Sequence, residues 1–113
     1  MHELSLCRHL LRTLEDQARC QRFRRVRAVR LAVGELAGVD LPALTFAYRV
    51  ATRGTLAEGS RLEIDTIPGA GRCPACGMEA PLARRHDPCP RCGAHGLVVT
   101  AGDELLIREL EVA

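Results

Sequence analysis

Apolar residues recur at intervals of three and four along the N-terminal part of the chain. Because residues with this spacing share one face of a helix, the pattern predicts an amphipathic helix over residues 3–19. Its expected buried stripe consists of Leu4, Cys7, Leu10, Leu11, Leu14 and Ala18. Charged side chains occupy the opposite face: Arg8, Arg12, Glu15 and Arg19. The first element is therefore expected to rest on a core along one side only.

The hydrophobic period then changes to two, which is typical of strands. Residues 25–35 predict a strand with two alternating faces, one formed by Arg27, Val29, Leu31 and Val33 and the other by Val26, Ala28, Arg30 and Ala32. Residues 61–66 alternate cleanly between polar and apolar and predict a second strand. After residues 97–99 the chain returns to a last strand over residues 104–112.

A second helix is expected between the first two strands, over residues 40–51. Asp40 stands where an N-cap belongs and Pro42 falls in the first turn, where a missing N–H costs nothing. The apolar stripe of this helix is formed by Leu41, Leu44, Ala47, Tyr48 and Ala51. We expect this stripe to face the same core as the first helix.

Four cysteines form two near-identical Cys-Pro-x-Cys-Gly segments, separated by residues 77–88. Each pair places two thiolates on one tight turn, and two such pairs can close a tetrahedral shell around one ion. Four soft thiolates suit Zn²⁺, which has no redox chemistry of its own. The sequence therefore predicts a structural zinc site with the ligands Cys73, Cys76, Cys89 and Cys92.

The order of elements predicts an α+β fold in which two helices pack on a small three-stranded sheet. A four-cysteine, zinc-ribbon-like domain over residues 70–98 is inserted between two strands. Residues 1–69 and 99–113 would form the α+β domain. Because the insert has few apolar residues, metal binding should supply most of its folding free energy, about 10–16 kcal/mol in small zinc units.

Bulk composition narrows the class of protein. The net charge of +2 and the aromatic content of 3% give little support to nucleic-acid binding. No stretch approaches the roughly 18 uninterrupted apolar residues of a membrane span. The N-terminus lacks the pattern of a secretory signal, so we expect a cytoplasmic protein with reduced thiols.

A closed tetrathiolate offers no open position for chemistry, so a labile metal has to bind elsewhere. Met1 contributes an α-amine with a reference pKa of about 7.7–8.0, and His2 contributes an imidazole, the commonest ligand of divalent transition metals. Glu3 can add its amide nitrogen or its carboxylate. A tetragonal, nitrogen-rich set favours Ni(II) or Cu(II). A histidine at this position alone does not distinguish a ligand from an ordinary exposed side chain.

Several segments together resemble the HypA (HybF) family. They are the opening Met1-His2-Glu3-Leu4-Ser5, both Cys-Pro-x-Cys-Gly segments, residues 33–40 (VGELAGVD), residues 52–64 (TRGTLAEGSRLEI) and residues 102–107 (GDELLI). The resemblance covers essentially the whole chain in the family's order. Its Cys76–Cys89 spacer is compact and lacks the long insertion of some relatives.

The resemblance implies a non-enzymatic nickel metallochaperone that serves the maturation of [NiFe]-hydrogenase. His2 would bind nickel with the Met1 amine and Glu3, and Ni(II) would be a cargo passed on to a client. The four cysteines would hold structural Zn(II). The implied partners are a GTPase accessory protein and the hydrogenase large-subunit precursor, with a homodimer also compatible and neither nucleic acid nor a membrane involved.

Other interpretations remain open at the level of sequence. A zinc-ribbon adaptor that binds nucleic acid or a protein assembly would show salt-dependent binding independent of His2, and iron on the four cysteines would give a rubredoxin-like electron carrier. His86 and His95 lie close to the cysteines and could lend a ligand. The arginines around the cysteines could offset the charge of a tetrathiolate zinc, and those over residues 19–30 could form a docking surface for an acidic partner.

Overall fold

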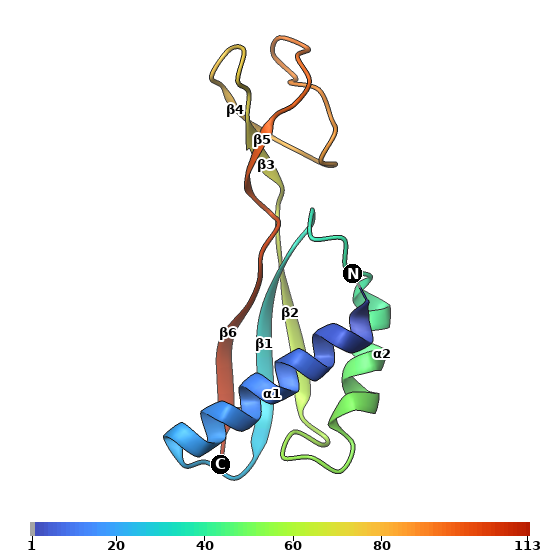
Figure 1. The fold of residues 1–113 in the computed structure, drawn as a ribbon, viewed down its shortest axis with the longest axis vertical. Coiled ribbons are helices and arrows are strands. Elements are labelled where there is room, and N and C mark those ends of the chain that lie inside the picture. Colours follow the sequence, from blue (N-terminus) through green and yellow to red (C-terminus); the bar gives the residue numbers. More distant parts are fainter. Residues whose placement is uncertain (1) are drawn as a thin grey trace. The chain divides into compact units, whose positions relative to one another are not determined.

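The computed structural model describes residues 2–113, and Met1 lies outside the described part (Figure 1). The two helices and three longer strands follow one another in the order predicted from the sequence, and three additional short strands lie between the last two of them. They are α1 (Glu3–Gln21), β1 (Val26–Gly34), α2 (Leu41–Thr52), β2 (Arg61–Ile67), β3 (Ala70–Arg72), β4 (Glu79–Pro81), β5 (Val98–Ala101) and β6 (Leu105–Val112).

The strands form two three-stranded sheets. One has the order β2-β1-β6, and the other has the order β4-β3-β5 with antiparallel pairing on both sides of β3. The expected α+β class with two helices, a three-stranded sheet and a four-cysteine insert is confirmed. The second sheet was not predicted, because strands of three or four residues are too short to show a period of two.

The chain forms two compact units. Unit 1 comprises residues 1–31, 39–64 and 107–113, and unit 2 comprises residues 32–38 and 65–106. The domain limits expected from the sequence, with residues 70–98 as the metal domain, stay a prediction. Unit 2 also includes residues 32–38, from which Leu36 packs among its buried residues.

Unit 1 is built on the contact between the two helices. Leu14 and Cys7 are the buried residues of α1, and Leu44 and Tyr48 lie in the buried stripe of α2. The Cys7 thiol lies 3.6 Å from the Leu44 carbonyl oxygen, to which it donates. This buried cysteine therefore fills a core position, as its place on the apolar stripe predicts.

The start of α2 confirms the predicted cap. The carboxylate oxygen Oδ1 of Asp40 accepts a hydrogen bond from the Ala43 amide at 3.1 Å, and Pro42 lies in the first turn. Such a cap satisfies one of the otherwise unpaired amides of a helix start and is worth about 1 kcal/mol. The carboxylate of Asp40 is therefore engaged in holding the helix.

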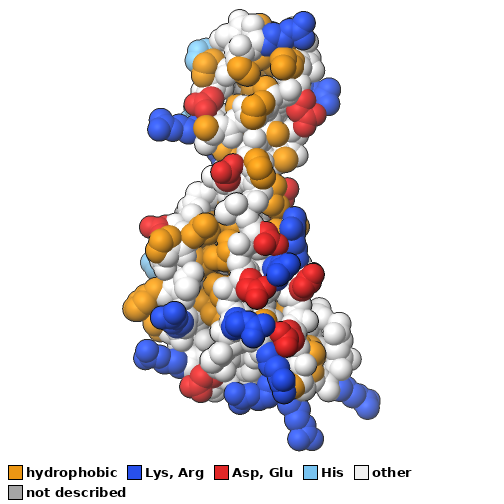
Figure 2. Space-filling model, turned by 180° about the vertical axis from the view of Figure 1, so that it is seen from behind, with side chains coloured by type: hydrophobic (Ala, Val, Ile, Leu, Met, Phe, Trp, Pro, Cys, Tyr) orange, Lys and Arg blue, Asp and Glu red, His pale blue; other side chains and the backbone are white. Residues whose placement is uncertain are grey.

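Ion pairs lie within and between the strands of the β2-β1-β6 sheet. Arg30 of β1 and Arg61 of β2 both approach the Glu63 carboxylate, at 3.0 and 3.7 Å, and Arg61 also meets Glu111 of β6 at 3.0 Å. Acidic and basic side chains accordingly lie side by side in the view of Figure 2. No helix of the described chain has the length and apolar character needed to cross a membrane.

Candidate metal centre

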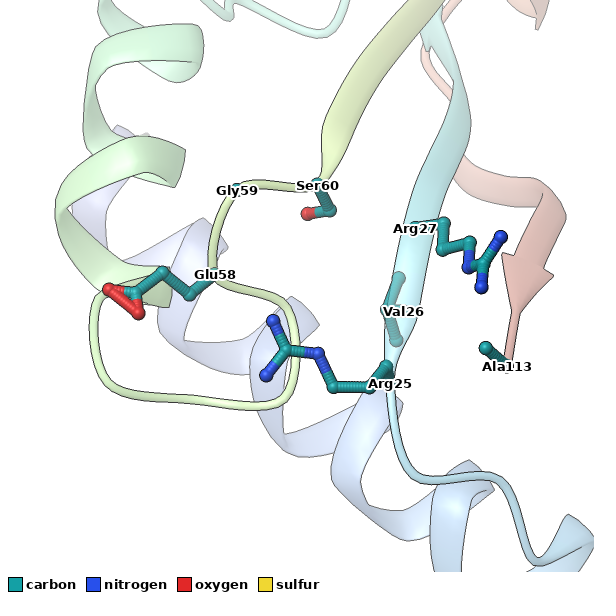
Figure 3. Close-up of a pocket in the computed structure, with 7 residues that line it drawn as sticks. All are labelled: Arg25, Val26, Arg27, Glu58, Gly59, Ser60 and Ala113. Carbon is teal, nitrogen blue, oxygen red and sulfur yellow. The ribbon is translucent and has the colours of Figure 1, made fainter.

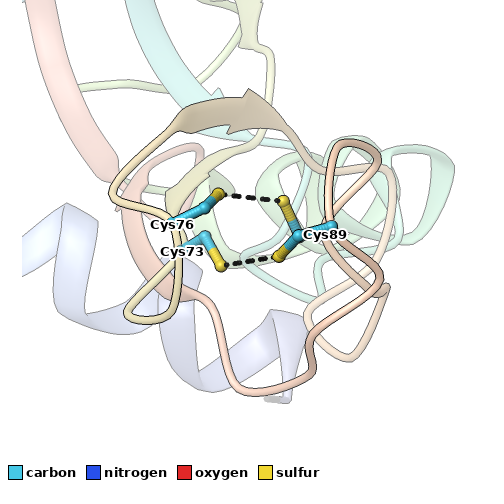
Figure 4. A group of neighbouring side chains, drawn as sticks. Cys73, Cys76 and Cys89 are labelled. Atoms are coloured by element: carbon cyan, nitrogen blue, oxygen red, sulfur yellow. Dashed lines mark hydrogen bonds between the residues drawn. The ribbon is translucent and has the colours of Figure 1, made fainter.

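Two turns of unit 2 bring the four predicted zinc ligands together (Figure 4). The sulfur of Cys73 lies 3.5 Å from that of Cys92, and the sulfur of Cys76 lies 3.8 Å from that of Cys89. All four sulfur atoms are within 4.8 Å of one another. Each of these two sulfur pairs joins a cysteine of the first turn to a cysteine of the second turn, so both turns are needed to form the site.

The spacing of the sulfur atoms fits a single tetrahedral ion. With metal–sulfur bonds of about 2.3 Å, a regular tetrahedron has sulfur–sulfur edges of about 3.8 Å. The observed separations of 3.5 and 3.8 Å lie close to that value. All six cysteines of the chain are free thiols, so no disulfide competes for these ligands. When bound, such an ion supplies structure rather than catalysis, because four protein ligands leave no open position.

The two turns have the same backbone hydrogen bonds. In the first, the Gly77 amide donates to the Cys73 carbonyl at 2.8 Å, and in the second the Gly93 amide donates to the Cys89 carbonyl at 2.8 Å. Gly77 and Gly93 have φ values of 73° and 77°, in the left-handed region that glycine adopts without steric cost. This requirement explains why glycine follows the second cysteine of each pair.

Backbone amides stabilise the thiolate of the first cysteine in each turn. The Cys76 amide lowers the pKa of the Cys73 thiol, and the Cys92 amide lowers the pKa of Cys89 to about 7, in both cases against the effect of burial. For Cys92 the effects have opposite signs. The Ala94 amide lowers the pKa of the Cys92 thiol, whereas the neighbouring sulfurs of Cys73 and Cys89, together with burial, raise it. The raising effects are larger together, and the pKa of Cys92 is about 11. Four thiolates at this distance therefore require a bound cation.

A small apolar cluster surrounds the sulfurs. The ligands Cys73 and Cys89 are buried together with Leu36, Ala80, Leu82 and Leu97. Leu36 comes from the turn that follows β1, and its amide donates to the Gly102 carbonyl at 2.6 Å. The metal centre thus contains a side chain from far earlier in the sequence than the cysteines, which the spacing of motifs did not indicate.

The remaining polar residues near the cysteines are not ligands in this arrangement. His86 and His95 are exposed and line a pocket of about 320 Å³ with Arg85, and neither belongs to the cluster of four cysteines. Arg72 lies 3.6 Å from the Glu79 carboxylate, and the Arg85 Nε donates to the Leu36 carbonyl at 3.2 Å. These two arginines therefore have protein partners of their own.

The predicted nickel ligands lie at the start of unit 1. His2 is exposed and precedes α1 with an extended backbone, φ −85° and ψ 118°, and its side chain makes no capping hydrogen bond. Its carbonyl accepts the Leu6 amide at 3.1 Å. Glu3 is half-buried in the first turn of α1. Met1, the third predicted ligand, lies outside the described residues.

The arginine-rich run over residues 19–30 is divided between several environments. Arg19 pairs with Asp16, and Arg30 pairs with Glu63. Arg25 and Arg27 line a pocket of about 310 Å³ beside Ala113 (Figure 3). Both the Arg24 and Arg25 amides donate to the Ala113 carbonyl, at 2.9 and 3.1 Å. The backbone of this run is therefore fixed, while the side chains of Arg25 and Arg27 are exposed.

Comparison with known proteins gives matches over the whole chain. The model of the family described as "Hydrogenase/urease nickel incorporation, metallochaperone, hypA" matches residues 1–112. The chain is similar to proteins named hydrogenase maturation factor HypA, each over 112 residues and 99% of both chains. Identity is 54% with that of Alkalilimnicola ehrlichii, 50% with that of Beijerinckia indica and 48% with that of Azotobacter vinelandii.

Two solved structures share the fold. The solution structure of the Ni metallochaperone HypA from Helicobacter pylori aligns with a TM-score of 0.73 at 23% identity, over 99% of this chain and 97% of that chain. A second solution structure of a HypA protein aligns with a TM-score of 0.69 at 22% identity, over 100% and 97% of the two chains. At 22–23% identity, these two similarities show the fold of the chain alone.

Proposed function

The chain belongs to the HypA family, and from this premise we propose that it is a nickel metallochaperone in the maturation of [NiFe]-hydrogenase. It would take up Ni(II) through His2, the Met1 amine and Glu3, and hold structural Zn(II) on Cys73, Cys76, Cys89 and Cys92. Ni(II) is the cargo of this protein, and no reaction is catalysed. The single observation that carries the proposal is the exposed imidazole of His2, which makes no capping hydrogen bond to α1.

The environment of His2 favours ligation. An N-cap side chain commonly accepts a hydrogen bond from the first helical turn, but the His2 side chain has no such bond. The first helical turn therefore does not occupy the ring nitrogens, and the residue lies in extended backbone outside the helix. Main-chain amides adjacent to it can join the imidazole in small chelate rings, a set that favours Ni(II) over Zn(II).

The two candidate sites suit different tasks. The sulfur ligands sit on two hydrogen-bonded turns and include the buried residues Cys73 and Cys89, so the loss of their ion would expose a core. His2 lies at the edge of its helix, where a ligand can leave an ion without disturbing packing. We therefore assign the resident ion to the cysteines and the transferred ion to the N-terminus.

Partners follow from the task of delivery. A carrier of nickel for [NiFe]-hydrogenase needs a recipient, which we propose is the hydrogenase large-subunit precursor, and an accessory GTPase that controls release. A cytoplasmic location accommodates the six free thiols, since reducing compartments keep cysteines unpaired.

The proposal is tested by nickel titration of zinc-loaded protein with its native N-terminus. We expect His2→Ala to abolish near-stoichiometric nickel binding in isothermal calorimetry and to leave the zinc content unchanged by elemental analysis. His9→Ala is the matched control, because His9 is an exposed histidine of the same helix. Equal nickel affinity of native protein and His2→Ala would overturn the nickel assignment, as would a loss caused by His9→Ala of the same size.

A further inference from the structure

One face of α2 carries exposed apolar and basic side chains that the fold does not use. Phe46, Arg49 and Val50 lie in α2 at the spacing of residues that share one side of a helix, and Arg53 is the C-cap residue that follows. The Phe46 side chain is 69% exposed and Val50 is 40% exposed, although both are large and hydrophobic. We call these four residues the α2 face. Figure 2 shows hydrophobic side chains beside arginines along the edge of unit 1 that α2 forms.

The α2 face is separate from the part of the helix that stabilises unit 1. Leu44, Ala47, Tyr48 and Thr52 are buried on the opposite side. Isolated exposed hydrophobic residues are common on protein surfaces. Here, however, an aromatic and an aliphatic side chain lie one helical turn apart and are flanked by two guanidinium groups, and aromatic residues and arginine are the types enriched in protein–protein interfaces.

The two arginines differ from those of the neighbouring sheet in their ion pairs. Arg30 and Arg61 of the neighbouring sheet pair with glutamates, whereas neither Arg49 nor Arg53 has a carboxylate partner among the described residues. Both line a groove of about 690 Å³ between α2 and the segment that leads into β2. The groove also contains Glu58 and Glu63, of which Glu63 already binds Arg30 and Arg61.

We propose that the α2 face is the docking surface for an acidic amphipathic helix of a partner protein. The apolar side of that helix would cover Phe46 and Val50, and its carboxylates would pair with Arg49 and Arg53. The α2 face runs from Phe46 to Arg53, about 11 Å along the helix axis, so a partner helix can pack along it. The inference does not depend on nickel binding.

Charge distinguishes this occupant from others. A second copy of the chain docked symmetrically on the same face would bring Arg49 and Arg53 of both copies together with no carboxylate on that face to offset them. A nucleic-acid backbone offers no apolar surface to cover the exposed side chains of Phe46 and Val50. An acidic helix with an apolar stripe satisfies both the hydrophobic and the cationic positions.

The test uses the full-length, zinc-loaded protein and a synthetic probe. The probe is an amphipathic helical peptide of about 18 residues, with leucines along one face and glutamates flanking them. A matched peptide has glutamine in place of each glutamate. Binding is measured by fluorescence anisotropy, and the contact surface is mapped by amide chemical-shift changes. We expect the acidic peptide to bind, with the largest shifts over α2, and the glutamine peptide to bind at least about tenfold more weakly.

Three variants locate the site. Phe46→Ser and Arg49→Glu should each weaken peptide binding by about tenfold or more, as expected at the centre of an interface. Arg24→Glu makes the same charge change at an exposed arginine of the residue 19–30 run and should weaken binding by less than about threefold. Nickel binding should be unchanged in all three variants, so failure here is distinct from failure of the proposed function.

Several outcomes would overturn the inference. They are an absence of binding by the acidic peptide, equal binding of the glutamine peptide, and an equal loss in Arg24→Glu. Shifts centred on residues 22–27 would place the contact on the arginine-rich run instead. Concentration-dependent dimerisation that Phe46→Ser abolishes in sedimentation experiments would assign the α2 face to a second copy of the chain.

Discussion

Leu36 provides a direct test of how the metal centre is held together. Its side chain is 6% exposed and packs in the cluster that contains Cys73 and Cys89. A β-carbon at Gly69 would lie only 2.7 Å from the Leu36 Cγ, which shows how closely backbone approaches this side chain. Leu36→Ala removes three carbons from that position without touching a ligand.

The magnitude follows from the burial. Three buried carbons at about 0.8 kcal/mol each give about 2.4 kcal/mol of lost transfer free energy, and the cavity left behind brings the total to about 3 kcal/mol. In a small metal unit the free energy of metal binding is largely the free energy of folding. A loss of about 3 kcal/mol should therefore appear as roughly a hundredfold weaker zinc binding.

The assay is a chelator competition that measures zinc affinity at constant pH. Leu44→Ala is the matched control, because Leu44 is 1% exposed but belongs to α2 in unit 1. The control should lower the denaturant stability of unit 1 by a comparable amount and leave zinc affinity within about threefold. Zinc affinity of Leu36→Ala within threefold of native protein would refute the coupling of packing to metal binding. A hundredfold loss in Leu44→Ala would refute its localisation to unit 2.

Two further predictions concern single residues. Burial raises the pKa of the Tyr48 phenol, although its hydrogen bond to Ser60 at 2.6 Å lowers it in part. Tyr48 is the only tyrosine and the chain has no tryptophan, so absorbance near 295 nm measures the ionisation of this phenol alone. Because the pKa of Tyr48 is raised in the folded protein, its contribution to the free energy of unfolding is fully present below the unfolded pKa of about 10. This contribution is lost as the pH rises through the folded pKa. A titration midpoint of Tyr48 in folded protein at or below that in denatured protein would contradict this prediction. Gly34→Ala should cost more than about 3 kcal/mol, because the added β-carbon would overlap the Gly102 carbonyl. Gly54→Ala, where φ is +72° but no atom lies within 4 Å, should cost about 1–2 kcal/mol, and equal urea midpoints for the two glycine variants would show that the close approach is not rigid.

The sequence predicted the elements that rest on local chemistry. Asp40 caps α2 as expected, since the preference of aspartate for a helix start depends only on nearby amides. The alternation around Val29 identified β1, and the cysteine spacing identified the four sulfurs that the structure brings within 4.8 Å. In each case the residues that determine the structural feature are close together in the sequence or belong to a recognisable motif.

Features that depend on distant contacts were not predicted. The sheet β4-β3-β5 consists of strands too short to show a period, and its pairing of Gly71 with Ala80 and Val99 joins segments that the cysteine turns separate in the sequence. The inclusion of Leu36 in the metal centre likewise joins residues far apart in sequence. The partners of Arg72 and Arg85 could not be chosen from a sequence that only places arginines near cysteines.

We propose that this chain keeps two metals on different ligands, with the resident ion on sulfur and the cargo on the N-terminus. X-ray absorption at the zinc and nickel edges of the same sample, loaded with one equivalent of each ion, tests it most directly. We predict four sulfur neighbours at about 2.3 Å around zinc and only nitrogen or oxygen neighbours around nickel, with an imidazole signature that His2→Ala removes. Sulfur in the nickel shell, or an unchanged nickel spectrum in His2→Ala, would contradict the account.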